Sequence, residues 1–333
     1  MRNFEFETIE QSYAPLIDAL IKEGQPVAPR GLGTRELSPV SITINDPRRN
    51  VISDACRRLN YGFMNAEFAW IMSQSNEAWI AHYNKNWLSF SDDGETLNGA
   101  YGDRVFRYRG PSKIIDQFEA AYEQLKADPL SRQATIVLFN PELDYRETKD
   151  KPCTNLMRFK IRNGKLQMIV FMRSNDVILG YPYDVFNFTS LQAVMASKLG
   201  VELGSYTHIV DSMHIYEDSV AWGQAIAAEQ VKPSIYDREF PSNVVPNITE
   251  ELQAFVNIEQ SSRKLSAELD LSKFEEMLES MTSDYWRSGA AMLALYNLRK
   301  NHRPQADLDR VSRFITSEFA QFVDRYTELK SSK

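Results

Sequence analysis

The strongest constraint on the fold is a hairpin signal near the middle of the chain. Two segments with a period of two residues, 155–162 and 165–172, flank Asn163-Gly164, the pair that most strongly favours a two-residue hairpin turn. Further strands are predicted at residues 40–44, 134–139 and 205–216. The middle of the chain therefore predicts a sheet that contains at least one tight hairpin.

Segments with helical spacing of apolar residues lie on both sides of these strands. Helices are predicted at residues 8–22, 50–75, 113–126, 185–199, 249–268, 271–299 and 305–329. The order is helices, then hairpins, then helices, without a regular strand–helix–strand rhythm, and it predicts an α+β fold. We expect residues 1–245 to form one part and residues 246–333 to form a charged helical extension, either a separate subdomain or a lid.

The composition limits the function classes. Of 333 residues 43% are hydrophobic and 25% are charged, and the net charge is −7. No basic field attracts nucleic acid or an anionic membrane, so we expect neither as a partner. The first residues lack the apolar core of a signal peptide, and no apolar run approaches the ~20 residues of a membrane span. We therefore expect a cytoplasmic protein, in the host cytoplasm if the source is viral.

The chain has two cysteines, Cys56 and Cys153, which are far apart and outside any metal-binding spacing. A disulfide framework is therefore excluded, and we expect no metal. Cys56 lies on the apolar face of a predicted helix, whereas Cys153 follows a polar loop and begins a strand, where a thiol can face a cleft. A nucleophilic thiol needs cationic neighbours, and Arg173-Ser174 at the end of a strand suits that role or a phosphate. The alternative for Cys153 is a small buried thiol without a catalytic role, and the alternative for Arg173-Ser174 is a solvated surface turn.

Three segments, in this order, resemble the thymidylate synthase and deoxycytidylate hydroxymethylase family: Pro152-Cys153, RSNDVILGYPYD at 173–184 and HIY at 214–216. The resemblance extends from about residue 8 to residue 220. It implies a thymidylate-synthase-like mixed sheet with flanking helices over residues 1–245 and a homodimer. It also implies that the substrates are a pyrimidine nucleoside monophosphate and 5,10-methylenetetrahydrofolate.

The resemblance implies roles for individual residues. Cys153 would add to C6 of the pyrimidine, so that C5 attacks the one-carbon unit, while Glu67 and Tyr101 would move protons. The phosphate and sugar would be bound by Arg30, Arg173, Ser174, His214, Tyr216 and, from the partner chain, Arg132. The folate side would be lined by Trp87, Asp176, Leu179, Gly180 and Tyr183.

Asp184 departs from the family's thymidylate synthases, which carry Asn at this position, and matches its cytidylate hydroxymethylases. A carboxylate accepts from the exocyclic amine of cytosine and pairs with N3 if that nitrogen is protonated as C6 is attacked. An ionised carboxylate opposite uracil O4 would leave two acceptors facing each other, which is costly in a buried site. Asp184 therefore predicts a cytosine nucleotide. The alternative is that Asp184 only caps the helix predicted at residues 185–199.

Other departures concern closure and phosphate binding. The synthases end in a short apolar tail that closes the site, whereas this sequence ends in the polar RYTELKSSK. We expect water to enter and add, giving a hydroxymethyl nucleotide and tetrahydrofolate. Thr154 replaces the usual His after the nucleophile, and Gln133 replaces the second Arg of the pair that begins with Arg132.

The sequence thus predicts a hydroxymethyltransferase for dCMP or CMP, and Ser174 beside Arg173 favours dCMP. The enzymatic alternatives are a thymidylate synthase acting on dUMP and a dUMP hydroxymethylase. The alternative from another class is a lapsed enzyme, a dimer that binds nucleotides or partner proteins.

Overall fold

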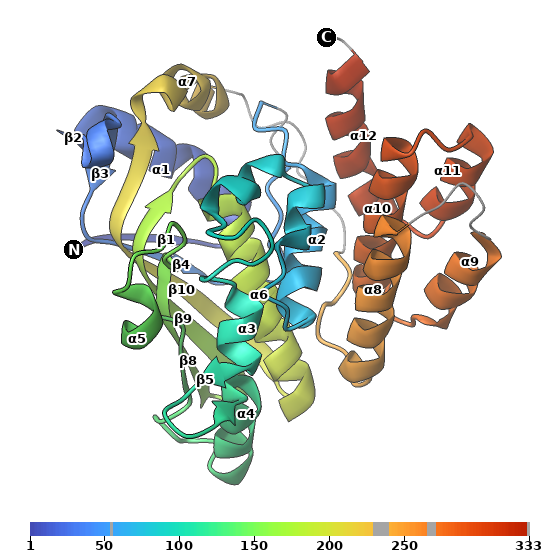
Figure 1. The fold of residues 1–333 in the computed structure, drawn as a ribbon, viewed down its shortest axis with the longest axis horizontal. Helices are drawn as coiled ribbons and strands as arrows, with labels where there is room; N and C mark the ends of the chain where they lie inside the picture. Colours follow the sequence, from blue (N-terminus) through green and yellow to red (C-terminus); the bar gives the residue numbers. More distant parts are fainter. Residues whose placement is uncertain (54–55, 229–239, 265–270, 332–333) are drawn as a thin grey trace.

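A computed structural model describes residues 1–53, 56–228, 240–264 and 271–331. Its main sheet has eight strands, six of them in the order β1-β4-β10-β9-β8-β7, with β3 paired to β10 and β2 to β3 (Figure 1). The strands of this sheet are β1 (Arg2–Phe6), β2 (Gln25–Val27), β3 (Thr34–Leu37), β4 (Val40–Ile44), β7 (Thr135–Val137), β8 (Thr154–Arg162), β9 (Lys165–Asp176) and β10 (Glu202–Tyr216). A separate pair is formed by β5 (Tyr108–Arg109) and β6 (Ile114–Ile115).

Helices flank one face of the sheet and fill the C-terminal third of the chain. They are α1 (Ile9–Glu23), α2 (Tyr61–Met72), α3 (Tyr101–Phe106), α4 (Gln117–Ala127), α5 (Pro141–Asp144), α6 (Tyr181–Leu199), α7 (Val220–Ala228), α8 (Ile248–Arg263), α9 (Leu271–Ser280), α10 (Asp284–Lys300), α11 (Gln305–Ser312) and α12 (Ser317–Ser331). Figure 1 shows three layers: the sheet, then α6 with α2, then α8 to α12. This arrangement confirms the predicted α+β class with a mixed sheet and C-terminal helices.

The hairpin predicted from Asn163-Gly164 is confirmed. β8 and β9 pair antiparallel around this turn, and φ is 53° at Asn163 and 74° at Gly164. Positive φ at both central residues matches the right-handed twist of the strands. The next connection was not predicted: β9 and β10 are parallel, and α6 crosses between them. Because parallel strands place their carboxyl ends at one edge of the sheet, the residues that end β9 and β10 meet there.

The helix predicted at residues 50–75 is wrong over its first part. α2 begins at Tyr61, where the Asn60 side chain caps it by accepting from the Phe63 N–H. Residues 54 and 55 lie outside the described residues, and Cys56 lies in a turn, not on a helix face. Val51 and Ile52 are buried in the core without being helical. Apolar spacing alone therefore could not separate a loop packed on the core from a helix.

Two other helix boundaries also differ from their predictions. The helix predicted from residue 113 begins at Gln117, after the Asp116 cap, because residues 114 and 115 pair with β5. α6 begins at Tyr181, four residues before its predicted start, with Pro182 in its first turn, a position that proline favours. The helix predicted at residues 249–268 ends at Arg263 within the described residues. The end of its predicted range lies outside them.

The C-terminal helices pack on α2. Trp286 of α10 stacks on Phe68 of α2, with ring centroids 5.3 Å apart. A Cβ on Gly289 of α10 would lie 2.8 Å from the Asn65 Oδ1 of α2, so a side chain there would force the helices apart. α2 is buried on all sides, and Glu67 is the one residue between Tyr61 and Ile71 that keeps some exposure. The extension therefore supports the helix that carries Glu67, while the boundary at residue 245 stays a prediction.

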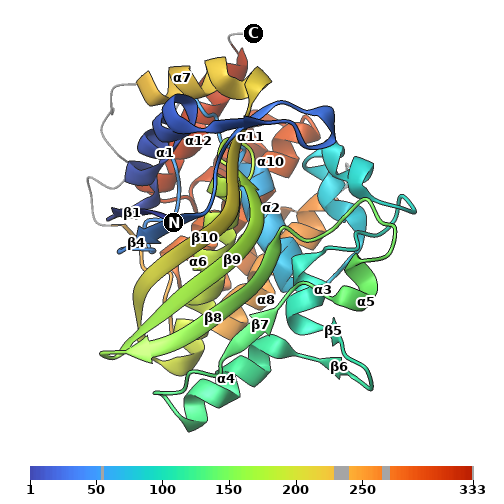
Figure 2. The ribbon, with the colours of Figure 1, turned by 90° about the vertical axis from the view of Figure 1, so that its left-hand side faces the viewer.

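The opposite face of the sheet is open. In Figure 2, β8, β9 and β10 lie in front of α6, and none of the described helices lies in front of these strands. An apolar row crosses four strands on this face, because Val137 pairs with Leu156, Leu156 with Phe171, and Phe171 with Ile209. All four side chains are partly or largely exposed.

Candidate active site

Cys153 lies directly before β8, beside Arg173 near the end of β9. The Arg173 N–H donates to the Cys153 carbonyl at 2.9 Å. Its guanidinium donates to the carbonyls of Pro152 at 3.1 Å and Lys151 at 2.9 Å. Burial raises the pKa of the Cys153 thiol, against the lowering effect of Arg173 and the smaller one of Arg30. The predicted cations are present, but burial outweighs them, so the free site holds the thiol.

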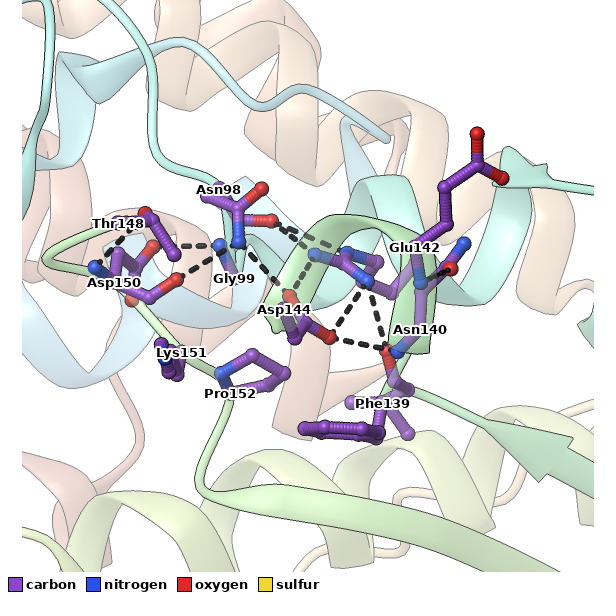
Figure 3. Close-up of polar contacts among 12 residues, drawn as sticks. Asn98, Gly99, Phe139, Asn140, Glu142, Asp144, Thr148, Asp150, Lys151 and Pro152 are labelled. Carbon is purple, nitrogen blue, oxygen red and sulfur yellow. Dashed lines mark hydrogen bonds and ion pairs between the residues drawn. The ribbon is translucent and has the colours of Figure 1, made fainter. Parts of the chain in front are cut away.

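A polar network holds the loop that leads to Cys153 (Figure 3). The Asp150 carboxylate accepts from the Gly99 N–H at 2.6 Å, and the Asp150 carbonyl accepts from the Asn98 side chain at 2.9 Å. The Asn98 amide also donates to Asp144 at 2.9 Å, and Asp144 forms a buried ion pair with Arg104 at 2.7 Å. A Cβ on Gly99 would lie 2.9 Å from the Asp150 carboxylate. The network ties the loop before the thiol to the segment that enters α3.

Tyr101, the first residue of α3, contacts the same strand as the thiol. Its hydroxyl accepts from the Thr154 hydroxyl at 2.9 Å, and its ring stacks on Phe188 of α6 at 5.9 Å. Burial, and then the nearby Asp184 and Cys153, raise the pKa of Tyr101 well above its usual value. Thr154, the residue that replaces the usual His, thus orients the phenol beside the thiol.

Two carboxyl groups, Glu67 on α2 and Asp184 on α6, are close enough to interact electrostatically, and an amide holds each one. Asn187 donates to Glu67 at 2.7 Å, and Asn175 donates to the Asp184 Oδ2 at 2.7 Å. Burial and repulsion by Asp184 raise the pKa of Glu67 to about 8, and burial raises the pKa of Asp184 to about 7. Groups with a pKa this close to neutrality suit proton transfer at physiological pH.

The alternative that Asp184 only caps a helix is wrong. The cap position of α6 is Gly180, and Asp184 lies inside the first turn, where its N–H donates to the Gly180 carbonyl. Its side chain bonds Asn175 of β9 and not the helix backbone. The carboxyl group is therefore available to the site.

Asp176 ends β9 and has one buried oxygen without a partner. Its Oδ1 accepts from the N–H groups of Ile178 at 2.7 Å and Leu179 at 3.0 Å. Its Oδ2 is buried and has no hydrogen-bond partner among the described residues. A buried, unpartnered acceptor is costly, and the amino and N–H groups of a pterin are donors that fit it. His214 lies beside Asp176 in the strand register.

The residues assigned to the folate side form an aromatic wall. Phe63 contacts both Tyr183, at 4.8 Å between ring centroids, and Trp87, at 6.3 Å. Phe90, which is 45% exposed, contacts Trp87 at 6.2 Å between ring centroids, and Leu179 is 52% exposed. Exposed apolar side chains beside aromatic rings favour a flat, conjugated ligand.

Ser174, His214 and Tyr216, expected from the resemblance at the phosphate and sugar, lie near the carboxyl ends of β9 and β10. Ser174 of β9 pairs with Ser212 of β10, and Ser212 lies two residues before His214. The His214 ring meets Tyr216 edge-on at 5.3 Å. Tyr216 pairs with Thr34 of β3, which closely follows the Pro29–Gly31 turn. Within this turn Arg30 is exposed, with φ of 54°.

Arg132 is not part of this group within one chain. It is exposed and precedes β7, and its carbonyl accepts from Arg158 in the middle of β8. Thr135 pairs with Arg158, whereas Cys153 precedes the first residue of β8. Arg132 therefore lies toward the opposite end of β8 from the thiol.

Three residues of the site were not predicted: Asn175, Asn187 and His208. Asn187 could have been predicted from the sequence, since it lies three residues after Asp184 and so shares its helix face. Asn175 stands inside the recognised RSND motif. His208 gave no signal beyond its place on the buried side of a strand, where the structure buries it completely.

Among the described residues no cluster of His, Cys, Asp or Glu is arranged to hold a metal ion. The part of the chain that the structure describes also has no helix long and apolar enough to cross a membrane.

The sequence of residues 11–270 matches the family described as thymidylate synthase. The chain belongs to the thymidylate synthase family. The recognition from the sequence motifs is therefore confirmed. Members of this family are folate-dependent one-carbon transferases that act on nucleoside monophosphates, with methylenetetrahydrofolate as co-substrate.

The relatives of this chain have more than one activity. The chain is 40% identical over 228 residues to the deoxyuridylate hydroxymethyltransferase of Bacillus phage SP01. The aligned region covers 66% of this chain and 60% of that protein. It is 29% identical over 216 residues to a putative thymidylate synthase of Methanocaldococcus jannaschii, covering 63% and 89%. It is 28% identical over 239 residues to the thymidylate synthase of Corynebacterium aurimucosum, covering 70% and 85%.

Proposed function

We propose that this chain transfers a one-carbon unit to C5 of a cytosine nucleotide, with dCMP as the first choice and CMP as the second. The products would be the 5-hydroxymethyl nucleotide and tetrahydrofolate. The observation that carries this proposal is the carboxyl group of Asp184 in the site, with a pKa raised to about 7 by burial.

A carboxyl with this pKa can read cytosine in its neutral form. The protonated oxygen donates to N3, and the other oxygen accepts from the exocyclic amine. As the base is attacked at C6, the proton moves onto N3, and the ionised Asp184 stays paired with it. Each Asp184 oxygen therefore keeps a hydrogen bond to the base before and after the attack, and no two acceptors face each other.

Uracil is the second candidate base, because the phage relative at 40% identity is named a deoxyuridylate hydroxymethyltransferase. A neutral carboxyl can also donate to uracil O4 and accept from N3–H. The choice between the two bases therefore depends on which Asp184 oxygen carries the proton. The name of the same relative favours hydroxymethylation over methylation for both bases.

The remaining residues supply the covalent and proton-transfer steps. Cys153 adds to C6 of the base as its proton passes through water to the ionised form of Glu67, and the nearby Arg173 stabilises the thiolate electrostatically. Glu67, with a pKa raised to about 8, exchanges protons near neutral pH. Tyr101, whose pKa is raised well above its usual value, stays protonated and hydrogen-bonds the water that removes the proton of C5. The folate supplies the one-carbon unit, and the free Oδ2 of Asp176 holds its pterin.

We also propose a homodimer formed through the open face of the sheet. Its apolar row of Val137, Leu156, Phe171 and Ile209 offers side chains that a second copy would bury. Such a dimer would bring the exposed Arg132 of one protomer to the phosphate bound by Arg30 and Arg173 of the other in this proposal.

The test is to incubate the purified protein with methylenetetrahydrofolate and, separately, dCMP, CMP and dUMP, and to weigh the products. We expect the mass of a cytosine nucleotide to rise by about 30 Da, the mass of an added CH₂O. Asp184→Asn should move the preference toward dUMP by about ten- to a hundredfold in kcat/KM. Asp18→Asn, a change of a side chain 49% exposed on α1, is the matched control. A wild-type preference for dUMP would overturn the choice of base.

A further inference from the structure

A chain of buried hydrogen bonds ends on Asp184. The Tyr206 hydroxyl and the His208 Nδ1 are 2.7 Å apart, and the His208 Nε2 and the Asn175 Oδ1 are 2.9 Å apart. The Asn175 amide then donates to the Asp184 Oδ2 at 2.7 Å. Tyr206 and His208 are fully buried, and Asn175 is 4% exposed. Water therefore does not compete for these bonds.

The bonds have one consistent direction. Burial lowers the pKa of His208 to about 3, so its ring is neutral and has one donor and one acceptor nitrogen. The NH₂ group of Asn175 faces the carboxyl of Asp184, and its oxygen therefore faces His208. It follows that the His208 Nε2 donates to Asn175 and that the Nδ1 accepts from the Tyr206 hydroxyl.

This direction makes the two oxygens of Asp184 unequal. Oδ2 receives a donor from Asn175, whereas Oδ1 makes no hydrogen bond with the described residues. An oxygen that already accepts a strong hydrogen bond is the poorer site for a proton, so the neutral carboxyl carries its proton on Oδ1. Gly180 keeps room for this arrangement, because a Cβ there would lie 2.7 Å from the Asn175 amide nitrogen and 3.3 Å from the Asp184 Oδ2.

We propose that Asn175, held in direction by His208 and Tyr206, is a positioning residue that keeps the Asp184 proton on Oδ1 and so sets the choice between cytosine and uracil. The proposal rests on the proposed function in one respect, that Asp184 faces the base. With Oδ1 toward N3, Oδ2 faces position 4, where the amine of cytosine donates and the carbonyl of uracil repels. Without Asn175 the proton moves between both oxygens, and both bases are accepted.

The first experiment compares kcat/KM for dCMP and dUMP in the wild type and in Asn175→Leu, whose side chain is similar in size but has no donor. We expect the preference of the wild type for one base to narrow by about ten- to a hundredfold, because loss of the buried Asn175 bond leaves the two positions of the Asp184 proton similar in energy. The limb of the pH profile that reports Asp184 should also move to higher pH, because the Asn175 bond lowers the pKa of Asp184. A general disturbance of the fold by the substitution would not shift the pH of this limb.

The second experiment tests the direction of the chain with paired variants of His208. His208→Gln keeps an N–H that donates to Asn175 and should retain most of the preference, whereas His208→Phe removes it and should narrow the preference. Tyr206→Phe removes one hydroxyl and should narrow it by about two- to tenfold. This variant keeps the test decisive if Asn175→Leu does not fold, as judged by circular dichroism and thermal unfolding.

The outcomes separate this inference from the proposed function. A wild type that prefers dUMP overturns both the cytosine assignment and the orientation of Oδ1 toward N3, yet narrowing of that preference in the variants still supports the role of Asn175 in fixing the position of the proton. An unchanged preference in a folded Asn175→Leu, or in Tyr206→Phe where the former does not fold, overturns the inference. If Asp184→Asn also leaves the preference unchanged, Asp184 does not read the base and both proposals fail.

Discussion

Glu67→Gln should stabilise the folded protein more at high pH than at low pH. Burial and the repulsion by Asp184 raise the pKa of Glu67 from 4.5 to about 8. In the unfolded chain the group ionises near its ordinary pKa, so between these two pH values the folded state binds more protons than the unfolded state. Its contribution to stability is therefore full below the unfolded pKa and is lost as the pH rises through the folded pKa. Gln removes this dependence because it never ionises.

The size of the effect follows from the same two pKa values. Each pKa unit corresponds to about 1.4 kcal/mol, which sets an upper limit of roughly 5 kcal/mol. Glu67 keeps some exposure, and the surrounding medium screens its charge, so we expect about 2 kcal/mol. The bond from Asn187 survives in the variant, because the amide oxygen of Gln also accepts.

The assay is urea denaturation of the wild type and of Glu67→Gln between pH 5 and pH 9, a window chosen to bracket the pKa of about 8. Protein concentration is held constant, since the stability of the proposed dimer would depend on it. The control is Glu123→Gln, which changes a carboxylate 57% exposed on α4. A difference in unfolding free energy between Glu67→Gln and wild type that is the same at both ends of the range would refute the reasoning.

Three further substitutions test other parts of the site. Cys153→Ser should abolish turnover and retain nucleotide binding by calorimetry, because an alcohol ionises far less readily than a thiol; near-wild-type product formation would remove Cys153 from the mechanism. Arg132→Ala should weaken nucleotide binding more than it lowers the unfolding free energy, and an active monomer in sedimentation at assay concentration would exclude the cross-subunit role. Asp144→Asn leaves the buried Arg104 without its counter-ion and should cost about 3–5 kcal/mol in urea denaturation. A loss below about 1 kcal/mol would show that water or backbone carbonyls satisfy Arg104.

The sequence predicted the fold correctly where one local preference determines the backbone conformation. Asn163-Gly164 predicted its hairpin because both residues tolerate the positive φ that the turn requires. α2 was harder, because it is buried on all sides and its apolar residues therefore give no stripe that marks its ends. Cys56 was placed on that helix for the same reason, although it lies in a turn.

The site was predicted through its motifs, but the bonds between its residues were not. Glu67 and Asp184 are 117 positions apart in the sequence, and no local pattern indicates that their charges meet. The partners that orient them, Asn187 and Asn175, are amides that read as ordinary buried polar residues. Their roles depend on tertiary contacts between α2, α6 and β9, which sequence periodicity does not encode.

The convergence of the motifs has a single physical cause in the sheet. β9 and β10 run parallel, so Ser174 and Asp176 at the end of one lie beside Ser212 and His214 at the end of the other. β8 is antiparallel to β9, so its start meets the same edge and places Cys153 there. A right-handed crossover through a helix such as α6 is the connection that parallel neighbours favour, and four residues separate the end of β9 from the first turn of α6. Cys153, Ser174, His214 and Asp184, to which the proposed function gives the nucleophilic, phosphate-, sugar- and base-binding roles, therefore lie at one edge because of strand direction, and a change of register in β9 would separate them.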